Sequence, residues 1–194
     1  TICNGNIYTI VPTGAVSYTF SSGSAVVNPS SNTVYSVSGT NSVGCESTNA
    51  ATISVVVNPL PTVSVNSGTM CYGQSFTLVP TGATSYTYSS GSSVVSPTTN
   101  TTYSITGSSL GCASAAPAIA NITVLTSPTV SVNGGSICAG QLFTLNPIGA
   151  VSYSYTGGSQ VVSPTITSNY TVTGYGSNGC SNINSAIASV TVFS

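Results

Sequence analysis

The sequence repeats itself three times with a period of about 67 residues. Two cysteines recur in every copy at spacings of 67 or 68 residues: Cys3, Cys71 and Cys138, then Cys45, Cys112 and Cys180. A Gly-Ala-x-Ser-Tyr-x-aromatic block also recurs, beginning at Gly14, Gly82 and Gly149. A fixed period of this kind is typical of tandem-repeat proteins. We therefore predict three domains: repeat 1 (residues 1–58), repeat 2 (59–126) and repeat 3 (127–194).

The local pattern predicts short strands and no helix. Apolar residues alternate with Ser or Thr in Thr62-Val63-Ser64-Val65 and Ile122-Thr123-Val124, which places one face of each strand in a core. Turn clusters such as Pro80-Thr81-Gly82 and Ser89-Ser90-Gly91 follow at roughly ten-residue intervals. This rhythm predicts an all-β chain of three tandem Ig-like antiparallel β-sandwich domains, with six or seven strands each.

The cysteines predict one disulfide in each repeat. A domain of about 67 residues buries a core of only marginal stability, and a covalent cross-link is a common supplement. Within each copy the two cysteines stand 41 or 42 residues apart, which predicts three pairs: Cys3 with Cys45, Cys71 with Cys112, and Cys138 with Cys180. Closing such a loop contributes roughly 4 kcal/mol. Metal ligation is disfavoured because two thiols alone leave a zinc ion half-coordinated. Disulfides imply an oxidising compartment.

Several motifs carry a resemblance to a known family. In order, they are Pro-Thr-Val-Ser-Val-Asn, Cys-x-Gly-Gln, Gly-Ala-x-Ser-Tyr-x-aromatic, Val-Val-x-Pro, Tyr-x-Ile/Val-x-Gly and Gly-Cys. This order resembles the Ig-like, PKD-like repeats found in tandem in secreted surface proteins of Bacteroidota-type bacteria. Phe20, Tyr88 and Tyr155 stand where those repeats often have Trp. The resemblance implies a spacer, adhesin or appendage role outside the cell and carries over no functional residue.

The side-chain chemistry argues against an enzyme. The chain has no Lys, Arg, His or Asp, and Glu46 is its one charged side chain. Serine nucleophiles need a base, calcium sites need clustered carboxylates, and phosphate binding needs cations. Glu46 has no counterpart in the other copies and is interpreted as a solvated loop residue. We therefore expect no catalytic residue, cofactor or metal, and no nucleic-acid partner.

Hydropathy argues against a membrane span. The most apolar run, residues 113–124, is interrupted by Ser114, Pro117 and Asn121, whereas a spanning helix needs roughly 18 or more apolar residues. The chain does not open with the basic and apolar regions of a signal peptide. We expect an extracellular or cell-surface protein whose export signal is absent from this chain, with no membrane insertion.

Repeat 1 lacks a segment that the other copies have. Repeats 2 and 3 open with an extra expected strand, at residues 61–66 and 128–133, whereas repeat 1 starts at Thr1-Ile2-Cys3. Two interpretations stay open. The missing strand leaves an edge that accepts a strand from a neighbouring subunit, with Thr1, Ile2, Ile7 and Thr9 as its candidate residues. Alternatively, the chain is a window on a longer array.

Two further residue sets have bland and functional interpretations. The Asn-x-Ser/Thr sequons at Asn100, Asn121 and Asn169 are weak candidates for glycosylation, because chance gives several in a chain rich in Asn, Ser and Thr. The repeated tyrosines Tyr18, Tyr86 and Tyr153 fit core packing better than a sugar-stacking face.

The low charge favours self-assembly, since subunits without net charge do not repel one another. We predict a structural subunit of an extracellular fibre, appendage or surface layer, built by head-to-tail contacts between copies of the chain. The alternative is a non-polymerising adhesin or spacer module that binds surface glycans or other cell-surface proteins. An ice- or surface-binding protein ranks third, because the Thr positions form no uninterrupted ladder.

Overall fold

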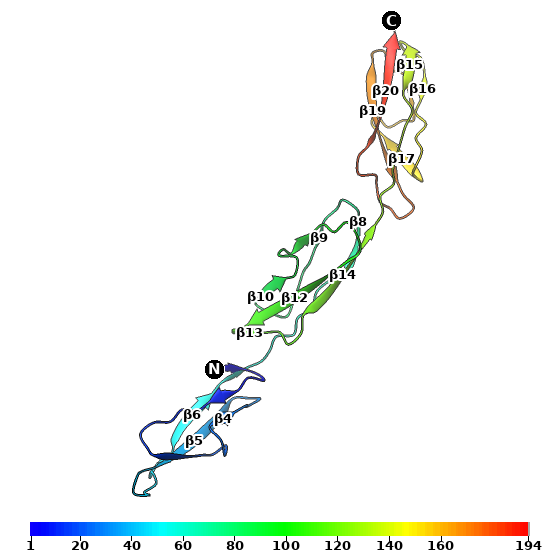
Figure 1. Ribbon diagram of the computed structural model, residues 1–194. Coiled ribbons are helices and arrows are strands. Elements are labelled where there is room, and N and C mark those ends of the chain that lie inside the picture. Colours follow the sequence, from blue (N-terminus) through cyan, green and yellow to red (C-terminus); the bar gives the residue numbers. More distant parts are fainter. Residues whose placement is uncertain (194) are drawn as a thin grey trace. The chain divides into compact units, whose positions relative to one another are not determined.

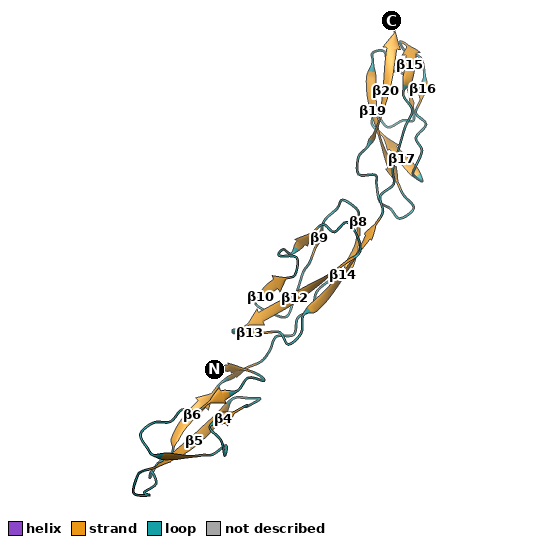
Figure 2. Cartoon of the chain, in the orientation of Figure 1, coloured by secondary structure: helices purple, strands orange, loops and turns teal. Residues whose placement is uncertain are grey.

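The computed structural model describes residues 1–193 as β-strands joined by turns (Figures 1 and 2). Within this range no residue is helical. The predicted all-β, Ig-like fold class is confirmed. Ser194, the last residue of the predicted third domain, lies outside the described residues.

The strands form where apolar and polar residues alternate. In Ala118–Leu125, Ala118, Ala120 and Ile122 are buried, whereas Ile119 and Asn121 between them are exposed. Successive side chains of a strand point to opposite faces, so this pattern buries one face. Ile119 is the exception to polarity on the outer face, at 49 % exposed.

The chain divides into two compact units. Unit 1 comprises residues 1–65, 80–91 and 104–119, and unit 2 comprises residues 66–79, 92–103 and the chain from Ala120 onward. Both junctions between consecutive repeats lie inside a unit, the first in unit 1 and the second in unit 2. Because repeat 2 contributes to both units, the domain boundaries at residues 58/59 and 126/127 stay predictions.

Repeat 1 forms two small antiparallel sheets and one parallel pair. Its strands are β1 (Ile2–Cys3), β2 (Tyr8–Thr9), β3 (Ser17–Phe20), β4 (Val26–Val27), β5 (Thr33–Thr40), β6 (Ala51–Val55) and β7 (Val57–Asn58). The main sheet has the order β3-β5-β6, β2 pairs with β4, and β1 runs parallel to β7. Ile10, Val27 and Val37 form the buried core, packed against Tyr8 and Phe20 among others.

Repeats 2 and 3 follow the same plan. Repeat 2 contains β8 (Gly68–Cys71), β9 (Phe76–Thr77), β10 (Ser85–Tyr88), β11 (Val94–Val95), β12 (Thr101–Ser109), β13 (Cys112–Ala113) and β14 (Ala118–Leu125). Repeat 3 contains β15 (Gly135–Cys138), β16 (Phe143–Thr144), β17 (Ser152–Tyr155), β18 (Val161–Val162), β19 (Ser168–Tyr175) and β20 (Ala186–Phe193). Their larger sheets have the orders β10-β12-β14-β8 and β15-β20-β19-β17, and Figure 1 shows β15 beside β20.

Each repeat contains one parallel strand pair that the sequence pattern did not predict. The strand that ends at the first cysteine runs alongside the last strand of its repeat: β1 with β7, β8 with β14, and β15 with β20. A parallel pair needs a long connection, and here the rest of the repeat provides it. The pairing places each first cysteine next to the C-terminal end of its own repeat.

The expected extra strands are shorter than predicted. In residues 61–66 and 128–133 the structure has isolated bridges, Ser64 with Thr81 and Ser131 with Ile148. The side chain of Asn133 adds to the second bridge, because its Oδ1 accepts a hydrogen bond from Asn146 N at 2.6 Å. These segments still cover part of the sandwich in their repeats.

The repeated tyrosines serve packing. Each is half-buried, and its hydroxyl accepts a hydrogen bond from a backbone N–H three residues earlier, at 2.8–2.9 Å: Tyr18 with Ala15, Tyr86 with Ala83, and Tyr153 with Ala150. A buried ring with its hydroxyl paired to the backbone is a structural anchor. This geometry supports the packing interpretation over the sugar-stacking one.

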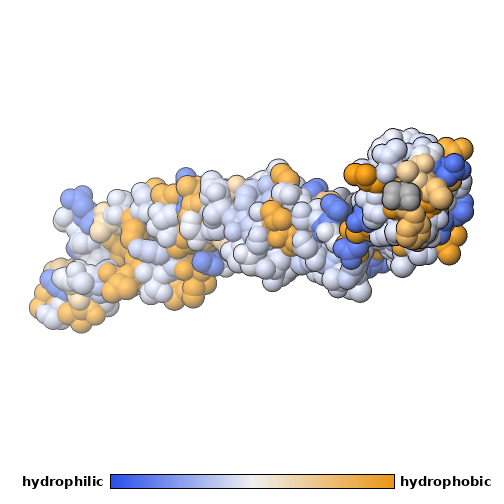
Figure 3. All heavy atoms as spheres, turned by 90° about the horizontal axis from the view of Figure 1, so that it is seen from above, coloured by the Kyte–Doolittle hydropathy of each residue, from blue (hydrophilic) through white to orange (hydrophobic). Residues whose placement is uncertain are grey.

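The surface is nearly uncharged and only moderately polar. Most of the face in Figure 3 has the pale colour of residues near the middle of the hydropathy scale, with scattered apolar side chains. Val43, Leu110 and Ile183 are among the exposed apolar residues, at 79, 73 and 56 %. None of the described residues belongs to a helix that is long and apolar enough to cross a membrane.

Candidate functional site: disulfide-linked junctions between repeats

The two disulfides join consecutive repeats. Cys3 bonds to Cys112 and Cys71 bonds to Cys180, with a Cα–Cα distance of 5.6 Å and a sequence separation of 109 residues in both. The first cysteine of one repeat is therefore linked to the second cysteine of the next. The predicted pairs within single repeats, Cys3 with Cys45, Cys71 with Cys112 and Cys138 with Cys180, are wrong.

The geometry of a repeat explains the correction. In repeat 1, Cys3 lies opposite Asn58, at the end of the last strand, whereas Cys45 lies in the loop that precedes Ala51, at the start of β6. Seven residues of extended chain separate Ala51 from Asn58, which is roughly 23 Å at 3.3 Å per residue. A disulfide needs Cα atoms within about 7 Å. The two cysteines of one repeat lie at opposite ends and cannot reach each other.

Cys45 and Cys138 are the two cysteines without a disulfide partner within residues 1–193, and both are exposed. Cys45 is a second cysteine, like Cys112 and Cys180, and Cys138 is a first cysteine, like Cys3 and Cys71. The four bonded cysteines are therefore those for which the chain supplies an adjacent repeat on the required side.

The first junction is supported by one further contact. The linker to repeat 2 begins at Asn58, the last residue of β7. Asn58 donates a hydrogen bond from Nδ2 to the carbonyl oxygen of Leu110 at 3.0 Å. Leu110 has φ = 52°, which is unusual for a residue with a side chain, and Gly111 and Cys112 follow it. Cys112 is 1 % exposed. The loop before Cys112 thus contacts repeat 1 at two points, the disulfide and the linker.

The second junction also has a hydrogen bond between the linker and the loop before the second cysteine, but here the loop is the donor. Here Asn178 in the loop donates from Nδ2 to the carbonyl oxygen of Thr126 in the linker, at 2.8 Å. Ser127 Oγ also donates to the carbonyl oxygen of Tyr72, at 3.3 Å. Cys180 is fully buried, at 0 % exposed. Both junctions therefore combine a disulfide with a hydrogen bond between linker and loop.

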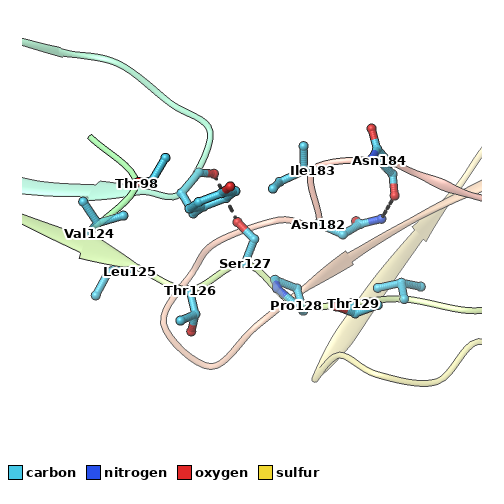
Figure 4. Close-up of a pocket in the computed structure, with 12 residues that line it drawn as sticks. Thr98, Val124, Leu125, Thr126, Ser127, Pro128, Thr129, Asn182, Ile183 and Asn184 are labelled. Carbon is cyan, nitrogen blue, oxygen red and sulfur yellow. Dashed lines mark hydrogen bonds between the residues drawn. The ribbon is translucent and has the colours of Figure 1, made fainter. Parts of the chain in front are cut away.

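A cleft of about 500 Å³ lies at the second junction. Figure 4 shows Ser127, Pro128, Asn182 and Ile183 around it, with the hydrogen bonds of Ser127 and Asn182 dashed. Asn182 is buried, accepts from Gly174 N at 2.8 Å through Oδ1, and donates to Asn184 O at 2.6 Å through Nδ2. Its polar atoms are thus occupied by the fold rather than directed at a ligand.

A second cleft, of about 380 Å³, lies in repeat 1, at the place where repeats 2 and 3 hold an extra chain segment. In repeats 2 and 3, a Cβ at Gly82 or Gly149 would lie 1.9 Å from the carbonyl oxygen of Thr62 or Thr129. The equivalent Gly14 has nothing within 4 Å of that position. Gly14 lines the cleft, as do residues 45 and 46, so the groove lies beside the unbonded Cys45.

The predicted acceptor residues Thr1, Ile2, Ile7 and Thr9 do not line this groove. Ile2 belongs to β1 and pairs with Val57, Thr9 belongs to β2 and pairs with Val26, and Ile7 is 66 % exposed. Thr1 is exposed and precedes β1. Thr9 lines another cleft of repeat 1, of about 270 Å³. Their role in strand acceptance stays a prediction.

The remaining candidate residues are on the surface. Asn100, Asn121 and Asn169 are exposed. Two of them are engaged: Asn100 Oδ1 accepts from Val124 N at 2.8 Å, and Asn121 Oδ1 accepts from Thr102 Oγ1 at 3.0 Å. Across residues 1–193, no three His, Cys, Asp or Glu residues gather as a metal site would need.

The hydrogen bonds that Asn58, Leu110 and Asn178 make at the junctions were not predicted from the sequence. The types of these residues differ between copies, so the repeat pattern did not mark them.

The comparisons with known proteins concern the fold alone. The sequence matches no protein-family model and no curated protein. Similar solved structures include the titin I-band fragment I67–I69, with 9 % identity, a TM-score of 0.40, and coverage of 100 % of this chain and 95 % of that one. Drosophila OTK extracellular domains 3–5 give 7 %, 0.32, and coverage of 84 and 72 %. A Ca²⁺-stabilised ice-binding adhesin of an Antarctic bacterium gives 13 %, 0.34, and coverage of 84 and 57 %. At these scores, the likenesses carry no argument about function.

Proposed function

We propose that this chain is a structural subunit of an extracellular fibre, appendage or surface layer. The observation that carries the proposal is the pair of disulfides between consecutive repeats, Cys3 with Cys112 and Cys71 with Cys180. Each junction then has two covalent connections, the linker and the disulfide. A hinge between two domains that are joined at two points bends less than one joined by a linker alone, which suits a protein that bears tension or keeps a fixed spacing.

The chemistry of the chain supports an extracellular place for this subunit. Structural disulfides persist in oxidising environments and are rare in the cytosol. The resemblance of the repeats to those of bacterial surface proteins supports the same location and a bacterial source. A surface of hydroxyl, amide and apolar groups with one charged side chain allows copies to associate without electrostatic repulsion. Copies of the chain are therefore the proposed partners.

The groove of repeat 1 offers a contact for head-to-tail assembly. In repeats 2 and 3 the corresponding space holds the segments around Val63 and Val130, whose Cγ2 atoms would lie 2.4 and 2.5 Å from a Cβ at Gly107 and Gly174. The equivalent Gly39 has no such valine beside it. A strand of the type Pro-Thr-Val-Ser-Val-Asn, supplied by a neighbouring subunit, would fill this groove by strand addition.

Electron microscopy of the oxidised protein tests the function. We expect unbranched filaments or ordered sheets whose axial repeat matches a three-repeat subunit. A solution that stays monodisperse at the mass of one chain over a wide range of concentrations contradicts the fibre proposal and leaves the spacer or adhesin alternative.

A peptide with the sequence of residues 59–66 tests the groove separately. It should bind repeat 1 and shorten the filaments by occupying the acceptor site. Gly14→Ala places a methyl group where the peptide backbone must pass and should abolish binding. Gly23→Ala is the matched control, because Gly23 also has positive φ and open space around its Cβ position but does not line the groove. Equal peptide affinity for both variants would exclude this acceptor site.

A further inference from the structure

The six cysteines occupy two kinds of position, and each kind has one member without a bond. First cysteines end the strand that runs parallel to the last strand of the repeat. Second cysteines follow the long strand β5, β12 or β19 within a few residues. Both disulfides join a first cysteine to the second cysteine of the next repeat. Cys138 is the first cysteine that is left over, and Cys45 is the second cysteine that is left over.

Cys138 has the same backbone surroundings as the bonded first cysteines. It pairs with Phe193 in β20, as Cys71 pairs with Leu125 in β14. The N–H three residues later donates to its carbonyl oxygen at 3.1 Å, compared with 3.0 Å at both Cys71 and Cys3. The position is therefore already in the conformation that carries a disulfide in the other two repeats.

The loop of Cys45 matches the loop of Cys180. Asn41 N donates to Cys45 O at 3.0 Å, and Gly176 N donates to Cys180 O at 2.8 Å. Asn41 Oδ1 also accepts from Cys45 N at 2.9 Å, which holds the loop closed. Cys45 thus needs no rearrangement of its loop to form the bond that Cys180 forms.

Burial distinguishes the unbonded second cysteine from the bonded ones. Cys112 and Cys180 are 1 and 0 % exposed, whereas Cys45 is exposed together with every residue from 41 to 50. The neighbouring groove, lined by Gly14 and Cys45, is the place that an adjoining chain segment fills in repeats 2 and 3. An open groove and an uncovered cysteine that lines it therefore mark the same end of repeat 1 as half of a junction.

We propose that Cys138 of one copy forms a disulfide with Cys45 of the next copy, so that the junction found twice within the chain is formed a third time between chains. The inference rests on the proposed function and names the bond that joins its subunits. The contact is heterologous, since each copy presents a different half at each end. Such a contact propagates into a filament when the rotation between copies does not close a ring.

The bond forms by thiol–disulfide exchange with a low-molecular-weight or protein disulfide of the oxidising compartment. One cysteine thiolate attacks that disulfide, releases one thiolate and forms a mixed disulfide. The second cysteine, as its thiolate, attacks the mixed disulfide and releases the other half. Overall, two cysteine thiols are oxidised to one disulfide, and the donor disulfide is reduced to two thiols, which take up the two protons.

Two single variants test the pairing, because each blocks one end of the chain. In a glutathione redox buffer, the wild-type chain should give a ladder of covalent oligomers on a non-reducing gel. Cys45→Ser alone and Cys138→Ser alone should stay monomeric. Their mixture should give a dimer and nothing larger. A covalent homodimer of either single variant, a monomeric mixture, or a wild-type monomer without free thiols overturns the proposal; the last result means that Cys45 and Cys138 bond within one chain.

Peptide mapping identifies the bond. Trypsin has no site in a chain without Lys or Arg, so pepsin is used, at an acidic pH that also suppresses thiolate exchange. In oligomers made from equal amounts of ¹⁴N- and ¹⁵N-labelled chains, peptide pairs that contain Cys45 and Cys138 should include mixed-label species. Pairs of one label only contradict a bond between chains.

Microscopy of the double variant Cys45→Ser/Cys138→Ser separates failure of this inference from failure of the proposed function. If the wild-type chain forms filaments in which both thiols stay free, the disulfide proposal fails and the fibre function stands. If the covalent dimer forms in the mixture but the wild-type chain gives no filament or sheet, the fibre function fails and the pairing stands. Long filaments of the wild-type chain together with only short filaments of the double variant support both the fibre function and the disulfide between copies.

Discussion

The loops of Cys45 and Cys180 have the same fold and different surroundings. Both close through a hydrogen bond from the residue four positions earlier to the cysteine carbonyl, at 3.0 and 2.8 Å. Cys180 is nevertheless fully buried and bonded to Cys71, whereas Cys45 is exposed and unbonded. The loop conformation is therefore a property of the repeat, and burial of its cysteine is a property of the junction.

The same contrast holds for the segment that precedes each repeat. Gly149 is covered by the backbone of Thr129, whereas Gly14 is open. On this side, repeat 3 is therefore covered by a chain segment and a bonded cysteine, whereas the described residues leave the same side of repeat 1 open. Equivalent substitutions in repeat 1 and in repeat 3 can therefore be compared. The difference between their free energies of unfolding measures how much the junction adds to the stability of the repeat.

The largest expected effect comes from removing the buried disulfide. The double variant Cys71→Ala/Cys180→Ala frees a loop of 109 residues, and the chain-entropy model gives a loss of roughly 4–5 kcal/mol in the free energy of unfolding. Cys45→Ala/Cys138→Ala also removes one cysteine of each kind and should leave the monomer's unfolding midpoint unchanged. Urea unfolding followed by circular dichroism measures both. Equal midpoints for the two double variants would show that the disulfide adds nothing at the junction.

The second effect comes from a methyl group at the covered glycine. Gly149 has φ = 100°, and the Cβ of Gly149→Ala would overlap the carbonyl oxygen of Thr129. Backbone strain and displacement of that segment should together lower the free energy of unfolding by roughly 3–5 kcal/mol. Gly14→Ala has φ = 97° and open space, so strain alone should cost about 1–2 kcal/mol. Thermal unfolding of the two variants separates the two contributions. A Gly14→Ala variant as unstable as Gly149→Ala would mean that repeat 1 has no open groove.

The all-β fold and the packing role of the tyrosines could be predicted from the sequence. Alternation of apolar and polar residues, the spacing of turns and the repeated tyrosines are local signals that the sequence shows directly. The direction of the strands was not predictable in the same way. A period-two pattern says which face of a strand is buried and nothing about whether its neighbour runs parallel, so the β15–β20 pair was missed.

The disulfide pairing failed for a related reason. The separation of 42 residues between Cys3 and Cys45 gives the length of a loop, but a sandwich has two ends and the sequence does not say at which end each cysteine lies. The hydrogen bonds of Asn58 and Asn178 were not predicted, because the donor lies in the linker at the first junction and in the loop at the second. No single position carries the signal.

A smaller effect is expected at the residue that follows the two loops. Asn182 is buried and its Oδ1 accepts from Gly174 N at 2.8 Å, whereas the equivalent Ser47 is exposed and accepts from Gly39 N at 3.1 Å. Asn182→Ala leaves a buried N–H unpaired and should cost about 1–3 kcal/mol. Ser47→Ala lets water replace the hydroxyl and should cost less than about 1 kcal/mol. Chemical unfolding compares them, and a Ser47→Ala loss as large as that of Asn182→Ala would mean that this region of repeat 1 is already covered.

The smallest expected effect is that of salt on joining the two halves. Glu46, next to Cys45, is the one charged side chain of the chain, and repeat 3 supplies no side-chain charge to pair with it. Screening acts on pairs of charges, so the initial rate of dimer formation between the Cys45→Ser and Cys138→Ser variants should change by less than about twofold between low salt and roughly 0.5 M NaCl. Glu46→Ser, which copies Ser181 beside the buried Cys180, should give the same rate. A strong salt dependence that disappears in Glu46→Ser would show that the exposed loop is guided by its charge, and hence that it meets a different partner surface from the uncharged one that covers Cys180.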